Sequence, residues 1–324
     1  MNGTRRDPLI SIITPVHNCL SHNEIFLESL KKYTYFPYEL IVIDNDSTDG
    51  SYELFQRTEC KSIRNQKNLC YPESINLGLP YARGEFICLL NNDVFCGVHW
   101  DKHLMDGMRM YNLDVVSPCG IERMPSLPLT HLFFRRWRRV GEKKHLGASS
   151  DGLRRLLLSM YGDWQKFCNT MHEMYYPQTM EGIVGNCVFL KKKVLEKIGF
   201  LDEQIQSADW DIYLRIKQRA EEIGDVHRVM TVCWAYVHHF IRTTLKSNPQ
   251  PFACLHPQRS IEEKWDKAIV TRLWPFPNEV TERPYFYKKP VNYWRYKWGK
   301  IKSRRIRTEN ENQWLQFWKE LDRA

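Results

Sequence analysis

The 324-residue chain is predicted to form an α/β fold, with a mostly parallel open sheet flanked by helices. Short β-branched apolar runs alternate with helix-like segments over the first hundred residues, and such alternation favours a parallel sheet. Three of these runs end in polar clusters, "TPVHN", "DNDSTDGS" and "NNDVF". Because ligands of open α/β sheets bind at the carboxyl ends of the strands, the clusters predict a binding site there.

The first hundred residues contain four expected strands and three expected helices. "LISIITPV" at 9–16 is a buried-strand pattern that Pro15 closes, and "YELIVIDNDSTDGS" at 38–51 is a strand that ends in a polar turn. Ile63 lies in a brief strand, and "GEFICLLNND" at 84–93 forms the next one. Helical spacing predicts helices at 21–35, 50–57 and 72–83.

The rest of the chain is less regular. A helix and a strand are expected within 97–118, a strand and a helix within 181–203, an amphipathic helix at 207–224 and a last strand at 228–240. Residues 120–180 lose clear periodicity, which indicates an insertion or a mobile lid. We therefore expect a main domain over 1–245 and a basic, aromatic-rich extension over 246–324, with helical pieces near 259–272 and 309–321.

The net charge of +9 is concentrated in two places. Residues 283–307, the basic segment, contain ten Lys or Arg and no acidic residue, and a second cluster, "FFRRWRRVGEKKH", lies at 133–145. Interleaved cations and aromatics suit an anionic membrane, a nucleic acid or a phosphate-bearing substrate. The alternative is a solvated charged face.

Cysteine spacing and hydropathy indicate the cellular compartment in which the protein is expected. The ten cysteines form no CxxC pair, which is typical of reduced core residues rather than of a disulfide framework or a zinc site. No run approaches the roughly 20 apolar residues of a membrane span, and the first residues lack a signal-peptide pattern. We expect a cytoplasmic protein, with peripheral contact to the membrane face.

Five stretches together resemble a known family. They are "ISIITPVHN", "ELIVIDNDSTDGS", "NLCYPESINLGLPYARGEFICLLNNDV", "GNCVFLKKKVLEKIGFLDE" and "SADWDIYLR", in this order over residues 9–240. The set resembles the inverting family 2 glycosyltransferases of the GT-A fold, in the style of rhamnosyltransferases. The resemblance implies a GT-A catalytic domain over 1–245, a UDP-, dTDP- or GDP-linked sugar donor, and a glycan or glycolipid acceptor.

The resemblance also implies a donor-binding set: Pro15, His17, Asp44, Asp46, Asn68, Arg83, Asn91 and Asn92. The carboxylate of Asp44 suits a base imide N–H or a ribose hydroxyl, since it only accepts hydrogen bonds. Turn chemistry in "DNDSTDGS" is the alternative for Asp46. Arg83 would stand near the diphosphate, or would simply favour the dipole of the helix that it ends.

A divalent metal, Mn²⁺ or Mg²⁺, is implied at the end of "LLNND". Asp93 ends the family's DXD element there, and Asn91 replaces its first aspartate, which removes one negative charge from the ion site. His238 and His239 stand where the family places a histidine that meets the metal or diphosphate. Adjacent strand residues point to opposite faces, so one of the two is expected to serve.

Asp209 stands at the family's catalytic base, within a Glu-Asp-x-Asp pattern in which Ala208 replaces the glutamate here. The alternative is that Asp209 and Asp211 are acidic residues that stabilise the start of a helix. Asp211 would position or cap, and Trp210 would stack on a sugar or pack. Acceptor or positioning roles are expected for Gly185, Asn186, Trp210 and Asp211.

The sequence thus predicts an inverting sugar transfer, with Asp209 as general base and a divalent metal held by Asp93. A sugar nucleotidyltransferase would need a Gly-rich phosphate loop after the first strand, and "TPVHNCLSHNE" has none. A nucleic-acid or membrane-binding protein that acts through its basic segment is the rival from another class, and it leaves the three polar strand ends unexplained. No specific nucleic acid is expected as a partner.

Overall fold

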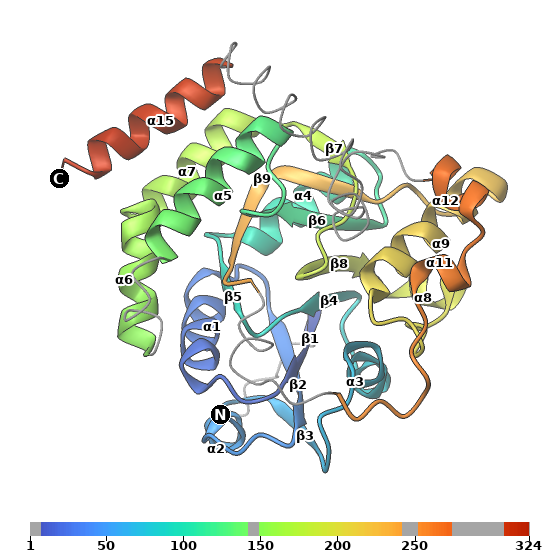
Figure 1. Cartoon of the computed structure of the whole chain (residues 1–324). Coiled ribbons are helices and arrows are strands. Elements are labelled where there is room, and N and C mark those ends of the chain that lie inside the picture. Colours follow the sequence, from blue (N-terminus) through green and yellow to red (C-terminus); the bar gives the residue numbers. More distant parts are fainter. Residues whose placement is uncertain (1–7, 142–148, 242–251, 274–307, 324) are drawn as a thin grey trace, which may run out of the picture.

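A nine-stranded mixed sheet forms the centre of the molecule (Figure 1). The computed structural model describes residues 8–141, 149–241, 252–273 and 308–323. The strand order is β3-β2-β1-β4-β8-β6-β9-β5, and β7 also pairs with β9. The strands are β1 (Ile10–Val16), β2 (Tyr38–Asn45), β3 (Lys61–Asn65), β4 (Phe86–Leu90), β5 (Val94–Cys96), β6 (Val115–Cys119), β7 (Thr179–Glu181), β8 (Cys187–Lys191) and β9 (Met230–His239).

Most strands run in the same direction. β3, β2, β1 and β4 are paired in parallel, and β8 is antiparallel to both β4 and β6, so β6 again runs with β4. β9 is parallel to β6, whereas β5 and β7 are antiparallel to β9. The mostly parallel sheet expected from the sequence is confirmed, and the carboxyl ends of β1, β2, β4, β6 and β9 share one edge.

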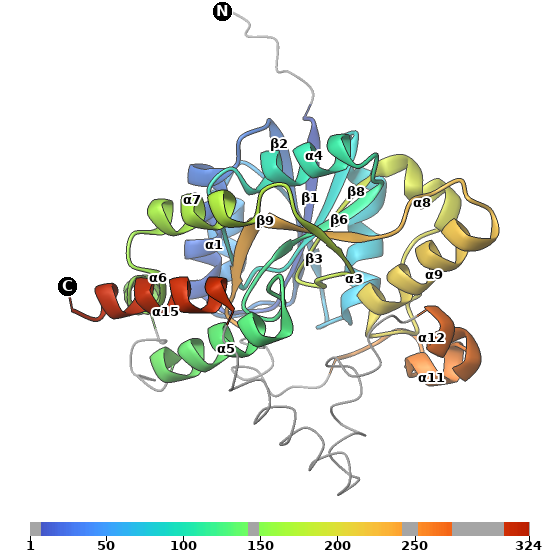
Figure 2. The same cartoon turned by 90° about the horizontal axis from the view of Figure 1, so that it is seen from above.

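Helices cover both faces of the sheet, as Figures 1 and 2 show. One side carries α1 (Leu20–Tyr33), α2 (Ser51–Gln56), α4 (Trp100–Met110), α5 (Leu127–Gly141), α6 (Ser150–Tyr161), α7 (Trp164–Tyr175) and α15 (Glu309–Leu321). The other carries α3 (Tyr71–Gly78), η1 (Leu79–Tyr81), α8 (Lys192–Ile198), α9 (Ala208–Glu222), α11 (Ile261–Lys264) and α12 (Lys267–Leu273).

Alternation along the strands explains the two helical layers. In β1, Ile10 and Ile12 pack in the cluster beneath α1 and α4, whereas Ile13 packs in the opposite cluster with Ile75 of α3. A strand that is buried on both faces needs apolar residues at successive positions, which is the pattern of "ISII". The β-branched runs read from the sequence are therefore central strands.

Residues 120–180 are not irregular, contrary to the expectation from their periodicity. Most of this region forms α5, α6 and α7, and the "FFRRWRRVG" cluster lies on α5. Buried Leu129, Leu132, Phe133 and Val140 make the apolar side of α5. Arg residues occupy the positions between these apolar residues, so the helical spacing of the apolar residues was not evident in the sequence. A lid role for this region stays a prediction.

The described parts of 246–324 pack against both helical layers. Trp314 and Trp318 of α15 are buried with Phe133 and Phe167, and Leu273 of α12 is buried against α9. The basic segment lies outside the described residues. The division of the chain at residue 245 stays a prediction. Among the helices that the structure describes, none is both long and apolar enough to cross a membrane.

Candidate active site

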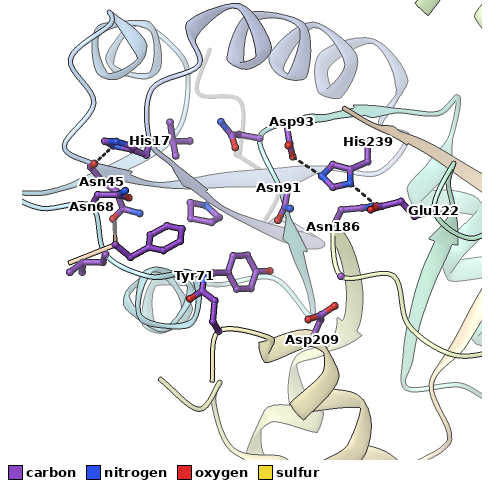
Figure 3. Close-up of a pocket in the computed structure, with 17 residues that line it drawn as sticks. His17, Asn45, Asn68, Tyr71, Asn91, Asp93, Glu122, Asn186, Asp209 and His239 are labelled. Carbon is purple, nitrogen blue, oxygen red and sulfur yellow. Dashed lines mark hydrogen bonds and ion pairs between the residues drawn. The ribbon is translucent and has the colours of Figure 1, made fainter. Parts of the chain in front are cut away.

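A cavity of ≈ 360 Å³ lies at the carboxyl ends of β1, β2 and β4 (Figure 3). Ten of the residues singled out from the sequence line it: Pro15, His17, Asn68, Asn91, Asn92, Asp93, Gly185, Asn186, Asp209 and His239. The other lining residues are Val16, Asn45, Leu69, Tyr71, Glu122, Gln206 and Phe252. The fold therefore brings three polar strand ends and the start of α9 to one place.

His17 presents a ring nitrogen to the cavity, and this nitrogen is an acceptor in the neutral imidazole. Its Nδ1 lies 2.6 Å from the carbonyl oxygen of Asn45 and must donate, because a carbonyl only accepts. Its Nε2 is buried and has no hydrogen-bond partner among the described residues, and the same holds for Oδ1 of Asn68. Figure 3 places both side chains on the same side of the cavity. Two such acceptors suit N–H and O–H donors of a bound molecule.

The asparagines after β4 differ in their partners. Asn91 Oδ1 is buried without a hydrogen-bond partner among the described residues, while its backbone N–H donates to Asn186 O at 3.0 Å. Asn92 instead donates from Nδ2 to Oδ1 of Asn23 on α1 at 2.7 Å. Asn92 therefore ties the strand end to a helix, and Asn91 keeps an acceptor oxygen available.

Asp93, His239 and Glu122 form a chain of carboxylate, imidazole and carboxylate (Figure 3). His239 Nε2 lies 3.1 Å from Asp93 Oδ1, and Nδ1 lies 2.6 Å from Glu122 Oε2. Asn186 Nδ2 also donates to Glu122 Oε2 at 3.0 Å. Burial acts to lower the pKa of His239, but the two flanking carboxylates raise it to about 10. Burial likewise acts to raise the pKa of Glu122, yet charged His239 holds it below its ordinary value.

A divalent cation bound at the Asp93–His239 pair would replace the Nε2 proton of the charged imidazole. Two ligands at right angles on an octahedral ion, each at about 2.1 Å, lie about 3 Å apart, close to the separation of the Asp93 and His239 ligand atoms. The acceptor oxygen of Asn91 lines the same cavity and is a donor atom of the kind that Mn²⁺ and Mg²⁺ accept. Glu122 behind the imidazole would orient it as a ligand.

Asp209 enters the cavity from the first turn of α9 (Figure 3). Burial raises the pKa of its carboxyl to about 6, backbone N–H groups of Trp210 and Asp209 act against this rise, and the charge of Glu122 adds to it. A Cβ on Gly185 would overlap the Asp209 carboxylate and stand 2.6 Å from its Cγ. Glycine at 185 therefore gives the carboxylate its space.

Three predicted donor-binding residues do not reach the cavity. Asp44 is fully buried, accepts from the Ser47 N–H at 3.2 Å and lies 3.6 Å from Arg64. Asp46 has a left-handed φ of 61°, and half of its side chain is exposed. This geometry is that of a turn residue, the alternative to donor binding that the sequence analysis gave for Asp46. Arg83 pairs with Glu39 at 2.8 Å, near the amino ends of β2 and β4, so the structure places it at the opposite edge of the sheet.

Three further predicted residues also lie elsewhere. His238 points into the aromatic layer, where its Nδ1 lies 2.7 Å from the Tyr161 hydroxyl, so His239 is the histidine that faces the cavity. Asp211 is fully buried and pairs with Arg215 and Lys264 at 2.8 and 2.7 Å, which ties α9 to α11. Trp210 is half-buried and does not line the cavity.

Sequence reasoning missed Glu122, Tyr71, Gln206 and Phe252. Glu122 follows β6 as the other polar clusters follow β1, β2 and β4, so the end of the predicted strand "LDVVSP" carried a usable signal. Phe252 comes from the stretch after Pro249 that resembles nothing nameable. Only the folded chain shows that it reaches this cavity.

The sequence profile described as "Glycosyl transferase family 2" matches residues 11–199, more than half of the chain. The chain belongs to glycosyl transferase family 2. The family resemblance read from the sequence is thereby confirmed, and the matched range contains most of the cavity residues.

Curated glycosyltransferases match the chain at low identity or over a short stretch. The chain is 22% identical over 226 residues to an uncharacterized glycosyltransferase of Rickettsia typhi, covering 66% of this chain and 60% of that protein. It is 33% identical over 90 residues to the Escherichia coli UDP-Glc:alpha-D-GlcNAc-diphosphoundecaprenol beta-1,3-glucosyltransferase WfgD, covering 27% of this chain and 36% of that enzyme. The matches thus span less than two thirds of these relatives.

Among solved structures, the mannosyltransferase PcManGT of Pyrobaculum calidifontis, in complex with GDP-Man and Mn²⁺, is 14% identical with a TM-score of 0.47. The superposition covers 74% of this chain and 59% of that chain.

Proposed function

We propose that the protein is an inverting glycosyltransferase that moves a sugar from a nucleoside diphosphate sugar to a hydroxyl group of a glycan or glycolipid. The observation that carries the proposal is that one cavity holds Asp209 together with the Asp93–His239 pair. Family 2 membership supports the reaction class. The name of WfgD says that it transfers glucose from UDP-Glc to a sugar linked to diphosphoundecaprenol. This relative supports the donor and acceptor classes of the proposal.

Asp209 is the general base of this proposal. With a pKa of about 6, its carboxylate is ionised at neutral pH and more basic than an ordinary aspartate. It takes the proton of the acceptor hydroxyl as that oxygen bonds to the anomeric carbon and the bond from this carbon to the diphosphate oxygen breaks. One displacement at the anomeric carbon inverts its configuration.

Asp93, His239 and Asn91 would hold a divalent cation, Mn²⁺ or Mg²⁺, which when bound supplies positive charge against the departing diphosphate. His17 Nε2 and Asn68 Oδ1, on the far side of the cavity, would accept hydrogen bonds from the nucleoside. With a glycolipid acceptor, the cations of the basic segment would hold the enzyme against an anionic membrane at its cytoplasmic face.

The proposal is tested with Asp209→Asn and a panel of UDP-, GDP- and dTDP-sugars with Mn²⁺. A matching donor should raise the Tm of both proteins, because the substitution leaves the rest of the cavity in place. Turnover should fall by about 10³-fold or more in the variant. The anomeric configuration of the wild-type product, read by NMR, should be opposite to that of the donor.

Asp106→Asn is the matched control, since Asp106 pairs with Lys102 on α4 and does not line the cavity. Turnover retained by Asp209→Asn would remove the base assignment. If no donor raises the Tm while anionic vesicles or heparin do, the protein is a binding protein rather than a transferase.

A further inference from the structure

Two thiols and a carboxylate meet outside the cavity described above. The metal-ligating atoms of Cys70, Glu73 and Cys254 all lie within 4.8 Å of one another. Cys70 is fully buried, Glu73 is 1% exposed, and Cys254 is partly exposed. No other group of three or more such ligands comes this close in the described part of the chain.

Local structure fixes the three side chains from two distant parts of the sequence. Cys70 is the N-cap of α3, and Glu73 lies at its third residue, where its Oε2 accepts from the Cys70 N–H at 3.3 Å. Cys254 belongs to the strap, residues 252–258, which runs over this helix start. Ala253 N donates to Asn68 O at 2.7 Å, and the N–H groups of Leu255 and His256 donate to Glu73 Oε1 at 2.6 and 3.1 Å.

The ligand atoms retain capacity for an ion. Glu73 Oε1 accepts from two amide donors, Oε2 accepts from the Cys70 N–H in a long contact, and the carboxylate also interacts with the Cys70 thiol. Around Cys70 Sγ the contacts are long, at 3.8 Å to Gln258 Nε2 and 3.9 Å to Glu203 O. Two sulfur ligands and one carboxylate oxygen form a set that zinc prefers over magnesium or calcium.

A metal explains the cluster better than a disulfide does. A disulfide would leave buried Glu73 Oε2 without a counter-charge, whereas a divalent cation neutralises it. A bound divalent ion takes both thiols as thiolate ligands and so uses all three side chains.

We propose that Cys70, Glu73 and Cys254 form a zinc site that fastens the strap to the start of α3. Binding releases the two thiol protons and leaves one position of a tetrahedral ion for water. The strap carries Phe252, and its Ala253 bonds to Asn68, so the ion would fix two residues of the cavity wall. Spacing along the chain did not indicate this site, because the two cysteines that complete it, Cys70 and Cys254, are far apart in the sequence.

Cobalt titration of the full chain tests the site without any assay of catalysis. The protein is reduced, treated with chelator and titrated with Co²⁺, which takes tetrahedral thiolate sites as Zn²⁺ does. We expect one equivalent to give an ultraviolet thiolate-to-cobalt charge-transfer band, and Zn²⁺ to bleach it. Cobalt at the Asp93–His239 pair has no thiolate ligand, so His239→Ala should keep the band.

Matched variants identify the ligands. Cys70→Ser and Cys254→Ser should each lose the band, Glu73→Gln should weaken Co²⁺ binding, and Cys60→Ser, a thiol outside the cluster, should bind as the wild type does. Cys254 is partly exposed, so its variant should fold even where the buried Cys70→Ser does not. Zn²⁺ should also raise the wild-type Tm by a few degrees and slow amide exchange of the strap, with neither effect in Cys254→Ser.

Three results would overturn the proposal. The first is a reduced wild-type protein that gives no thiolate band. The second is a band that survives in Cys254→Ser. The third is a Cys70–Cys254 disulfide found by mass spectrometry in a protein that binds no metal when reduced, which would make the pair a redox link instead.

Discussion

At the scale of single residues, the protonation of Asp209 sets the expected pH dependence. The pKa of about 6 means that the base is protonated, and therefore inactive, below that pH. We predict that kcat/KM falls about tenfold for each pH unit below 6, and this is measured from initial rates at low donor concentration. An acid limb near pH 4 would show that Asp209 keeps an ordinary pKa and is not the titrating base.

The same carboxyl costs stability. Its pKa is higher in the folded chain than the usual 3.8, so the cost is present above about pH 6 and disappears as the pH falls toward 4. Asp209→Asn should therefore raise the free energy of unfolding by about 1–3 kcal/mol at pH 7 and by little at pH 4. Urea unfolding at both pH values measures this. If Asp209 served mainly to stabilise the start of the helix, the same substitution would lower the free energy of unfolding instead.

Gly185 should be needed for activity rather than for folding. Alanine at 185 would push the Asp209 carboxylate from its place, because the added Cβ overlaps it. We predict that Gly185→Ala lowers kcat by about 10²-fold with a small change in Tm, since a misplacement of 1 Å can cost this much. Gly141→Ala is the control, because a Cβ there would meet nothing within 4 Å. Equal kcat values for the two variants would contradict the assigned role of Gly185.

Residues that follow strand ends could be predicted, because a buried strand that turns polar marks the binding edge of the sheet. Asn91 and Asp93 were singled out in this way and His239 by the family resemblance, and all three line the cavity. Arg83 was misplaced, since its position in a family pattern does not reveal the nearby Glu39 that holds it at the other edge. Glu122 could have been found by the same rule, since it follows β6, whereas Phe252 depends on tertiary contacts that no local pattern contains.

At the scale of elements, α9 divides its two aspartates between two tasks. The i, i+2 spacing points them apart, as expected from helix geometry, so Asp209 faces the cavity and Asp211 is buried against α11. Asp211 accepts from Trp265 Nε1 at 2.9 Å in addition to its two cations. Asp211 therefore holds α11 against α9 and does not line the cavity, where the sequence had suggested a role for it.

Removing the Asp211 carboxylate should detach this element. Asp211→Ala leaves Arg215 and Lys264 without their shared partner, and breaking such a buried pair costs about 3–5 kcal/mol. We expect a lower free energy of unfolding and faster amide exchange over 261–273. Glu222→Ala removes an exposed carboxylate of the same helix and should change stability by less than about 1 kcal/mol. Unchanged exchange over 261–273 in Asp211→Ala would show that other contacts hold α11 and α12.

At the scale of the whole molecule, the two helical layers are completed by segments from beyond the matched family range. The sequence correctly placed helices near 259–272 and 309–321, since both have amphipathic spacing. Their docking was not predictable, because a helix that is apolar on one side does not name the surface that it covers. Trp314 of α15 donates from Nε1 to the Tyr175 hydroxyl at 2.9 Å, within the layer formed by α5, α6 and α7.

This docking separates two roles of the C-terminal region. Truncation after residue 307 removes Trp314 and Trp318 and uncovers Phe133 and Phe167, so we predict a large loss of stability. Trp314→Ala alone should cost about 3–5 kcal/mol in urea unfolding. If 280–324 were deleted, a loss of vesicle binding could therefore result from unfolding as well as from the loss of the membrane-binding segment.

Charge replacement avoids this confusion. A chain in which the Lys and Arg residues of the basic segment are changed to Gln keeps α15 and should keep the wild-type Tm. Its binding to vesicles with anionic lipid should fall steeply, because each cation near such a surface contributes about 1 kcal/mol. Binding to neutral vesicles is the control. If the variant binds anionic vesicles as well as the wild type does, the membrane contact lies elsewhere, and α5 with its exposed Arg135, Arg138 and Arg139 is the next surface to change.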